Sequence, residues 1–189
     1  VSNCIADEYS RIYRIPKPHV VLNCPPYQEL IKNDFFRDSL SIRSDQIIFL
    51  YQGVLGRGRG IELLLEAFSD LEGDNNVLVC MGYGPLENLI QERAKHHSAI
   101  YFHPAVSPDV LLNFTSSADY GVSFVEDCSL NGRYCLPNKL FEYLMAGLPV
   151  LTSNLPEMKL LVETEAVGVV AEENTVRGLK KDLQKALDK

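Results

Sequence analysis

A helix-forming segment in the last third of the chain carries the groups expected at a phosphate site. The apolar pattern predicts a helix over 138–146 that begins directly after Pro137. The backbone N–H groups of Asn138, Lys139 and Leu140 would be free at the positive end of this helix, where a diphosphate binds well. The segment therefore predicts an anion site built mainly from backbone groups.

One acid in the same helix has a spacing suited to a sugar hydroxyl. Glu142 lies about one turn in, and Leu140, Phe141, Leu144 and Met145 are expected to form the buried face. Glu142 would then be free to accept hydrogen bonds from a ribose at the open end of the helix. The alternative is an ordinary amphipathic helix between two strands, with Glu142 only balancing the helix dipole.

A second segment combines glycines with fixed positive charge. A strand predicted over 46–51 leads into a loop that contains Gly53, Arg57 and Arg59, and a helix is predicted over 60–72. Closely spaced glycines let the backbone approach a ligand, and arginine suits phosphate. The alternative is a flexible basic turn on the surface. Because the order Gly-x-Gly-x-x-Gly is absent, no dinucleotide site is indicated.

The elements that must position these groups alternate along the chain. Alternation of this kind predicts βαβ units on a mostly parallel sheet, an α/β Rossmann-like three-layer domain. Ligands of such sheets bind at the carboxyl ends of the strands, so the loops that follow the strands are expected to form one site. Strands are predicted at 46–51, 76–81, 99–103, 119–124, 149–152 and 166–170, and helices at 60–72, 85–96, 107–116, 138–146, 155–163 and 174–188.

Composition excludes several functional classes. A chain of 189 residues with 46% hydrophobic content can bury one full core. Its net charge of −7 argues against a general nucleic-acid binder. The five cysteines and four histidines show no metal-ligand spacing, so no metal is expected and the thiols are expected to be reduced. No apolar run is long enough to span a bilayer and no secretory signal opens the chain, which predicts a cytoplasmic location.

The helix at 138–146 and the residues after it resemble the sugar-nucleotide motif of GT-B glycosyltransferases, in particular glycosyltransferase family 4. That family has an E-x7-E pattern, and Glu142 matches its second, ribose-binding glutamate. The residues 146–150 match the small-residue helix end and Pro-Val strand that follow. The sequence departs from the family at Tyr134, where the first glutamate is expected. Glu126 and Asp127 are the nearest acids, and either of them is a candidate for the group that faces the donor sugar, with Glu126 counted among the catalytic residues. The alternative is that both are surface acids on a polar loop.

Three further segments resemble the same family. Arg59-Gly60 stands where the family has Lys-Gly, whereas Val54 occupies the place of a family arginine that Arg57 would replace. The segments 77–86 and 100–106 resemble the strands that lead into the nucleotide site. The resemblance therefore adds Tyr83 and Val106 to the predicted nucleotide-binding residues.

The resemblance implies a glycosyltransferase that moves a sugar from a nucleoside-diphosphate donor to a glycan or lipid-linked acceptor. It implies retention of configuration, a role in surface polysaccharide synthesis, and no cofactor besides the donor. Arg57, Arg59 and the backbone of 138–140 would stabilise the leaving diphosphate. Residues 1–15, which have a short helical pattern after Ser2 and Asn3, resemble the crossover from a missing acceptor-binding domain. Residues 20–23 resemble the short strand that opens the second domain. Residues 16–189 form the donor-binding domain, which alone is expected to be inactive. Peripheral membrane association of the full-length enzyme stays open.

Two alternatives belong to other classes. Sugar-nucleotide epimerases share the GT-B plan, and the residues do not separate them from glycosyltransferases. A non-catalytic nucleotide-binding module is the second alternative. A phosphoacceptor regulator of this kind would need clustered acids after the first strand, where Gln52-Gly53-Val54 offers none.

Overall fold

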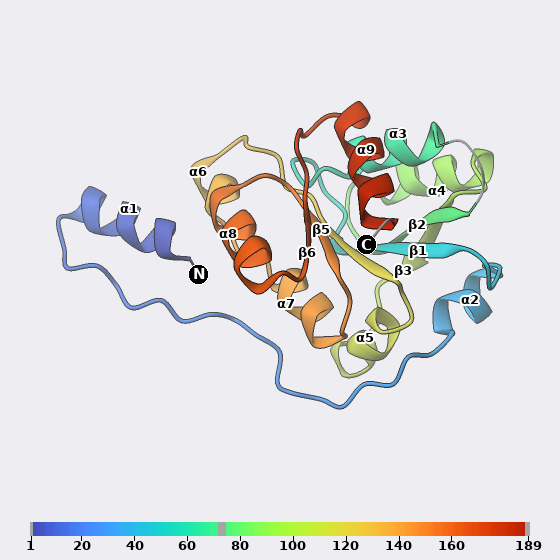
Figure 1. The fold of residues 1–189 in the computed structure, drawn as a ribbon, viewed down its shortest axis with the longest axis horizontal. Coiled ribbons are helices and arrows are strands. Elements are labelled where there is room, and N and C mark those ends of the chain that lie inside the picture. The colour runs from blue at the N-terminus through green and yellow to red at the C-terminus, as the bar shows by residue number, and fades with distance from the viewer. Residues whose placement is uncertain (1, 72–74, 188–189) are drawn as a thin grey trace.

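The computed structural model describes residues 2–71 and 75–187, and within them one parallel sheet forms the centre of the molecule (Figure 1). Its six strands lie in the order β3-β2-β1-β4-β5-β6, and every neighbouring pair is parallel. The strands are β1 (Ile47–Val54), β2 (Asn76–Tyr83), β3 (Ile100–Pro104), β4 (Tyr120–Ser123), β5 (Val150–Thr152) and β6 (Gly168–Val170).

Helices connect the strands and cover both faces of the sheet. The predicted Rossmann-like α/β fold is therefore confirmed. The helices are α1 (Asn3–Tyr13), α2 (Phe35–Leu40), α3 (Ile61–Ser69), α4 (Glu87–His96), α5 (Pro108–Thr115), α6 (Leu130–Arg133), α7 (Asn138–Met145), α8 (Pro156–Glu165) and α9 (Val176–Leu187).

Two cores lie on opposite faces of the sheet. Alternate residues of β1 show the division, since Phe49 and Tyr51 pack against α3, α4 and α9, whereas Ile48 and Leu50 pack against α2, α5, α7 and α8. In Figure 1, α3, α4 and α9 lie above the sheet, α2, α5 and α7 lie below it, and α8 lies to the left of β6. Because both faces are covered, the strands read as nearly continuous apolar runs.

The predicted strand ends of β1 and β2 are too early. Prediction ended these strands at residues 51 and 81, but they continue to Val54 and Tyr83. The extension follows from pairing, because Gly53 lies opposite Gly82 in the parallel register. A Cβ on Gly82 would lie only 1.9 Å from the Gly53 carbonyl oxygen, so the close approach requires glycine there. The last residues of two predicted helices, 72 and 188, lie outside the described residues.

The N-terminal region crosses the molecule before the first strand (Figure 1). The predicted helix at the start is confirmed as α1, with Ser2 as its N-cap. The chain then runs to α2 with no helix or strand between them, so the strand predicted by resemblance at 20–23 is wrong. Val21 is 77% exposed, and no sheet edge pairs with this segment. The helix α2 was not predicted.

Contacts at both ends hold this region to the body of the domain. The Cys4 N–H donates to the Glu157 carboxylate of α8 at 2.5 Å. At the other end, the Lys32 ammonium donates to Asp119 Oδ1 at 2.8 Å.

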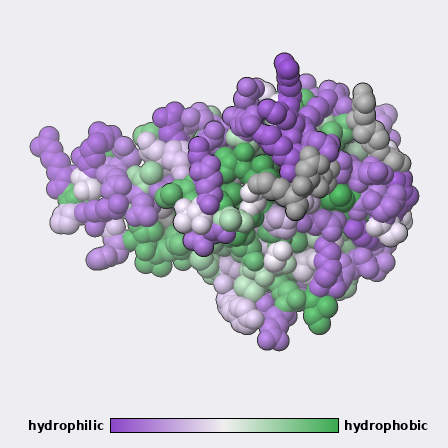
Figure 2. All heavy atoms as spheres, in the orientation of Figure 1, coloured by the Kyte–Doolittle hydropathy of each residue, from purple (hydrophilic) through white to green (hydrophobic). Residues whose placement is uncertain are grey.

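In Figure 2, hydrophilic side chains cover both ends of the face of the molecule that is shown, whereas hydrophobic ones gather across its middle. No helix within the described ranges has the length and apolar character needed to cross a membrane.

Candidate functional site

A pocket lies where β1 ends and α7 begins, at the carboxyl edge of the sheet. We call it the carboxyl-edge pocket, and its volume is about 390 Å³. The position agrees with the general location of ligand sites in open parallel sheets. Its lining combines residues from the glycine loop, from α5 and from the start of α7, namely Gln52, Gly53, Val54, Arg59, Leu111, Pro137, Asn138, Lys139 and Glu142.

The start of α7 has backbone N–H donors that could bind an anion. Pro137 is the N-cap, and no side chain caps the helix. In the described part of the chain, no acceptor is recorded for the N–H groups of Asn138 and Lys139, which begin the first turn. The prediction was wrong for Leu140, because its N–H donates to the Pro137 carbonyl at 3.0 Å and its side chain is fully buried in the core.

Glu142 faces the pocket, but it already has one partner. Its Oε2 accepts a hydrogen bond of 2.5 Å from Gln52 Nε2. The Gln52 Oε1 in turn accepts from the Thr115 hydroxyl at 2.8 Å. This chain of contacts fixes the orientation of the carboxylate and leaves its other oxygen for a further donor. It links β1, α5 and α7 at one point beside the pocket.

The buried face of α7 differs from the predicted one. Lys139, Leu140 and Tyr143 are the buried residues, whereas Phe141, Leu144 and Met145 are only half-buried. The Tyr143 hydroxyl explains the difference, because it accepts from the Gln52 N–H at 3.0 Å and donates to the Val122 carbonyl at 3.2 Å. These bonds rotate α7 so that Tyr143, rather than Phe141, faces the sheet.

A glycine in β4 makes room for this tyrosine. A Cβ on Gly121 would lie 2.2 Å from the Tyr143 ring. The close contact brings the start of α7 against the sheet next to the end of β1. Gly121 thus positions the helix end that forms one wall of the carboxyl-edge pocket.

The glycine loop reaches the pocket through one of its two arginines. Arg59 lines the pocket, while Arg57 is exposed and is not part of the lining. Gly60 begins α3 in the left-handed conformation at φ 67°, and a Cβ there would lie 2.6 Å from Phe124 Cβ. Glycine at this position therefore sets the direction in which Arg59 leaves the loop.

The predicted sugar-facing acid lies beside the loop but lines a different pocket. The Glu126 N–H donates to the Gly58 carbonyl at 3.0 Å, and the Glu126 side chain lines a pocket together with Gly60 and Glu62. The neighbouring Asp127 is paired with Arg133, which lowers the pKa of its carboxyl group. The structure therefore does not bring these two acids into the carboxyl-edge pocket, and the role of Glu126 stays a prediction.

Two other predicted residues also lie outside the pocket lining. Tyr83, the last residue of β2, is 63% exposed. Val106 follows β3 and packs partly against the core on the α5 side of the sheet. Both lie at the carboxyl edge of the sheet, and their contact with a nucleotide remains a prediction.

The burial of the Lys139 side chain in the pocket wall was not predicted. Its side chain is only 7% exposed, and its Nζ lies 3.5 Å from the centroid of the Tyr51 ring. Burial and the positive charge of Arg59 lower the pKa of the Lys139 ammonium to about 7. A cation in the wall thus adds to the N–H groups and to Arg59.

Gln52, Val54, Leu111 and Pro137 line the pocket without having been predicted as site residues. For Gln52 a signal existed, because a buried amide that follows an apolar strand needs hydrogen-bond partners. Leu111 lies on a helix of ordinary amphipathic pattern and offered no signal.

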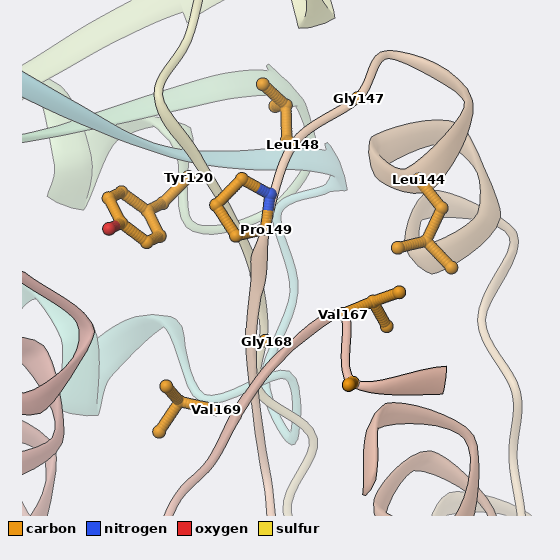
Figure 3. Close-up of a pocket in the computed structure, with 9 residues that line it drawn as sticks. Tyr120, Leu144, Gly147, Leu148, Pro149, Val167, Gly168 and Val169 are labelled. Carbon is orange, nitrogen blue, oxygen red and sulfur yellow. The ribbon is translucent and has the colours of Figure 1, made fainter. Parts of the chain in front are cut away.

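A second pocket of about 550 Å³ lies at the opposite, amino edge of the sheet (Figure 3). Tyr120 and Gly168, the first residues of β4 and β6, line it, and we call it the amino-edge pocket. Its lining contains no charged residue, so it offers nothing to balance a phosphate. The other lining residues are Leu144, Gly147, Leu148, Pro149, Ala166, Val167 and Val169.

Comparison with known proteins gives one family and several solved structures. The model of the family described as "Glycosyl transferases group 1" matches residues 32–189. WaaG, a glycosyltransferase involved in lipopolysaccharide biosynthesis, is similar with a TM-score of 0.66 and 23% identity, over 86% of this chain and 44% of WaaG. No curated protein sequence matches the chain.

Two more solved structures share the fold. Sucrose-phosphate synthase from Thermosynechococcus elongatus has a TM-score of 0.71 and 21% identity, over 100% of this chain and 48% of that chain. Anabaena Alr3699/HepE in complex with UDP and glucose has a TM-score of 0.63 and 14% identity, over 81% of this chain and 43% of that chain. The chain thus spans less than half the length of these structures, and at such identities the likeness shows the fold alone.

Proposed function

Because the chain belongs to the glycosyl transferases group 1 family, we propose that its carboxyl-edge pocket binds the nucleoside diphosphate of a sugar donor. Membership of this family agrees with the predicted GT-B resemblance, whereas the narrower assignment to family 4 remains a proposal. The sugar is then transferred from the donor to an acceptor.

One observation carries the proposal. Arg59 and the first N–H groups of α7 come from segments about 80 residues apart in the sequence, yet they line one pocket together with the carboxylate of Glu142. Positive groups suit the diphosphate, and the carboxylate suits the hydroxyls of the ribose. A nucleoside diphosphate carries both kinds of group.

The same groups suit the chemistry of transfer. When the bond between the sugar and the diphosphate breaks, negative charge develops on the leaving phosphate oxygen. Arg59 and the N–H groups of Asn138 and Lys139 stabilise this charge more strongly in the transition state than in the ground state. Glu142, held by Gln52, keeps the nucleoside end in place while the bond breaks.

The finer parts of the proposal rest on the family resemblance. Retention of configuration, an acceptor that is a glycan or a lipid-linked glycan, and a role in surface polysaccharide synthesis are proposed on that basis. We place the protein in the cytoplasm, where nucleotide sugars are the donors. The acceptor is proposed to bind mainly outside the region shared with the solved structures, so this chain alone is expected to bind donor without transferring sugar.

Isothermal titration calorimetry with UDP, GDP and ADP tests the proposal. One of the three is expected to bind clearly more tightly than its parent nucleoside, because the phosphates supply the contacts to Arg59 and to α7. The proposal is overturned if none of the three binds more tightly than the nucleosides do. An exposed-residue variant, Arg93→Ala on α4, provides a control that keeps the pocket unchanged.

A further inference from the structure

A buried lysine in the wall of the carboxyl-edge pocket has no acidic partner. Within residues 2–71 and 75–187, the Lys139 Nζ has no hydrogen-bond partner, although this atom is shielded from solvent. Taking an ammonium group out of water is costly unless it is paired, and buried lysines are normally paired with a carboxylate. Lys139 therefore carries a charge that the surrounding protein does not balance.

The groups around Lys139 explain why its ammonium is not paired with a carboxylate. The nearest acid, Glu142, shares its helix and is held by Gln52 Nε2. The Tyr51 ring offers only a cation–π contact, and the positive charge of Arg59 opposes that of Lys139. The titratable and charged groups that face Lys139 are Tyr51 on β1, Cys80 on β2, Arg59 in the glycine loop, Cys135 before α7 and Glu142 on α7.

The two thiols and the phenol among these neighbours do not titrate where Lys139 does. Burial raises the pKa of the Cys80 thiol to about 12, and burial also raises the pKa values of Cys135 and Tyr51. Burial and then the charge of Arg59 lower the pKa of Lys139 to about 7. Near neutral pH this lysine therefore exchanges its proton while the thiols and the phenol around it stay neutral.

We infer that the side-chain ammonium of Lys139 is a direct ligand of the donor's diphosphate, and that diphosphate binding adds one proton from solvent to this side chain. The inference rests on the proposed function, and it goes beyond the backbone role predicted for this residue. The flexible four-carbon stem lets Nζ turn from the Tyr51 ring to a phosphate oxygen beside it. The negative charges of the diphosphate then supply the partner that the protein lacks.

The sign of the pH dependence of diphosphate binding follows from the pKa of Lys139. In the free protein the pKa of Lys139 lies near 7, and a bound diphosphate raises it. Above pH 7 the free lysine is mostly neutral, so binding takes up a proton and affinity falls as the pH rises from 7.5 to 9. A terminal phosphate has a second pKa of about 6 and is already ionised across this range, so the fall does not come from the phosphates of the ligand.

Calorimetry in buffers of different ionisation enthalpy measures the proton directly. The titrant is whichever of UDP, GDP and ADP the wild-type chain binds, at pH 8 and in two buffers. Wild type is expected to take up close to one proton per site. Lys139→Met, which keeps the length and apolar packing of the stem, is expected to take up almost none and to bind the diphosphate about 10- to 100-fold more weakly at pH 7, as for the loss of a charged hydrogen bond.

Two further variants make the test specific. Lys159→Met removes a lysine from the exposed side of α8 and is expected to keep both the affinity and the proton uptake of wild type. Lys139→Arg keeps a permanent positive charge, and it is expected to bind the diphosphate without proton uptake. The parent nucleoside should bind Lys139→Met and wild type equally, since it has no phosphate.

The outcomes separate this inference from the proposed function. Absence of proton uptake by wild type, or uptake that persists in Lys139→Met, overturns the inference even when the diphosphate binds well. Unchanged diphosphate affinity in Lys139→Met does the same. If wild type binds none of the three diphosphates, the proposed function itself fails. If Lys139→Met does not fold, Lys139→Arg takes its place, and proton uptake that persists in Lys139→Arg overturns the inference.

Discussion

Replacing Tyr143 by phenylalanine should destabilise the sheet that carries the pocket. The hydroxyl is fully buried, and it bridges the Gln52 N–H of β1 to the Val122 carbonyl of β4 at 3.0 and 3.2 Å. It does so just beyond Leu50 and Gly121, the last two residues at which β1 and β4 pair with each other. Its removal leaves one buried donor and one buried acceptor without this partner.

The magnitude follows from these two groups. Each buried polar group left without its partner costs about 1–3 kcal/mol, so Tyr143→Phe should lower the free energy of unfolding by about 2–6 kcal/mol. For a chain of this size, this corresponds to a fall of roughly 4–24 °C in melting temperature. Burial raises the pKa of the Tyr143 phenol well above its usual value, so the same loss is expected at pH 6 and pH 9.

Urea unfolding followed by circular dichroism measures this loss. The midpoint should shift while the slope stays unchanged, which shows that stability rather than compactness has altered. Tyr27→Phe, at a position that is 81% exposed, is the matched control and should change the free energy of unfolding by less than about 0.5 kcal/mol. A loss equally small in Tyr143→Phe would refute the reasoning that the hydroxyl joins the two strands.

Three further predictions concern the pocket itself. Arg59→Ala should weaken binding of a nucleoside diphosphate by about 1–3 kcal/mol in calorimetry while Arg93→Ala leaves it unchanged; equal affinity in both variants would remove Arg59 from the phosphate site. Glu142→Gln keeps the shape but accepts hydrogen bonds more weakly, so diphosphate affinity should fall while the melting temperature barely changes; the reverse pattern would make Glu142 structural. Gly60→Ala should cost about 1–3 kcal/mol of stability in urea unfolding because of its positive φ and its contact with Phe124, and an unchanged midpoint would contradict that contact.

The strands after residue 45, and the helices there other than α6, could be predicted because their apolar patterns are regular. The four-residue helix α6 was not predicted. Apolar runs such as 76–83 are typical of strands buried on both faces, and the helices between them show a 3.6-residue period. The ends were less accurate because pairing decides them. Gly53 extends β1 only because Gly82 lies opposite it, and that register is not visible in either segment alone.

The part before residue 45 was harder to predict. Val20–Asn23 has the composition of a strand, but it has no neighbouring strand, and composition alone does not produce pairing. The short helix α2 begins after Asn33, whose side chain accepts from the Phe35 N–H at 3.1 Å. This turn is a local signal for the start of a helix. The helix that follows has only six residues, which is too short for its pattern to be conspicuous.

In the pocket, charge and glycine could be predicted but the burial of side chains could not. Gly53, Arg59, Asn138, Lys139 and Glu142 were all predicted and all line the carboxyl-edge pocket. The orientation of α7 against the sheet decides whether Lys139 is buried and which of the first N–H groups of the helix lack a hydrogen-bond acceptor.

That rotation is set by Tyr143, Gly121 and Gln52, which are far apart in the sequence. Gln52 reaches Glu142 and Thr115 across 90 and 63 residues, so its part in the site depends on tertiary structure.

The most direct test of the central claim is to locate a bound nucleoside diphosphate on the chain by its effect on backbone amide signals in ¹⁵N-resolved NMR. The account predicts that the amides of Asn138, Lys139 and Gly53 at the carboxyl-edge pocket shift on titration, and that those of Gly147 and Gly168 at the amino-edge pocket do not. Shifts confined to Gly147 and Gly168 would contradict it, because the ligand would then lie at the opposite edge of the sheet.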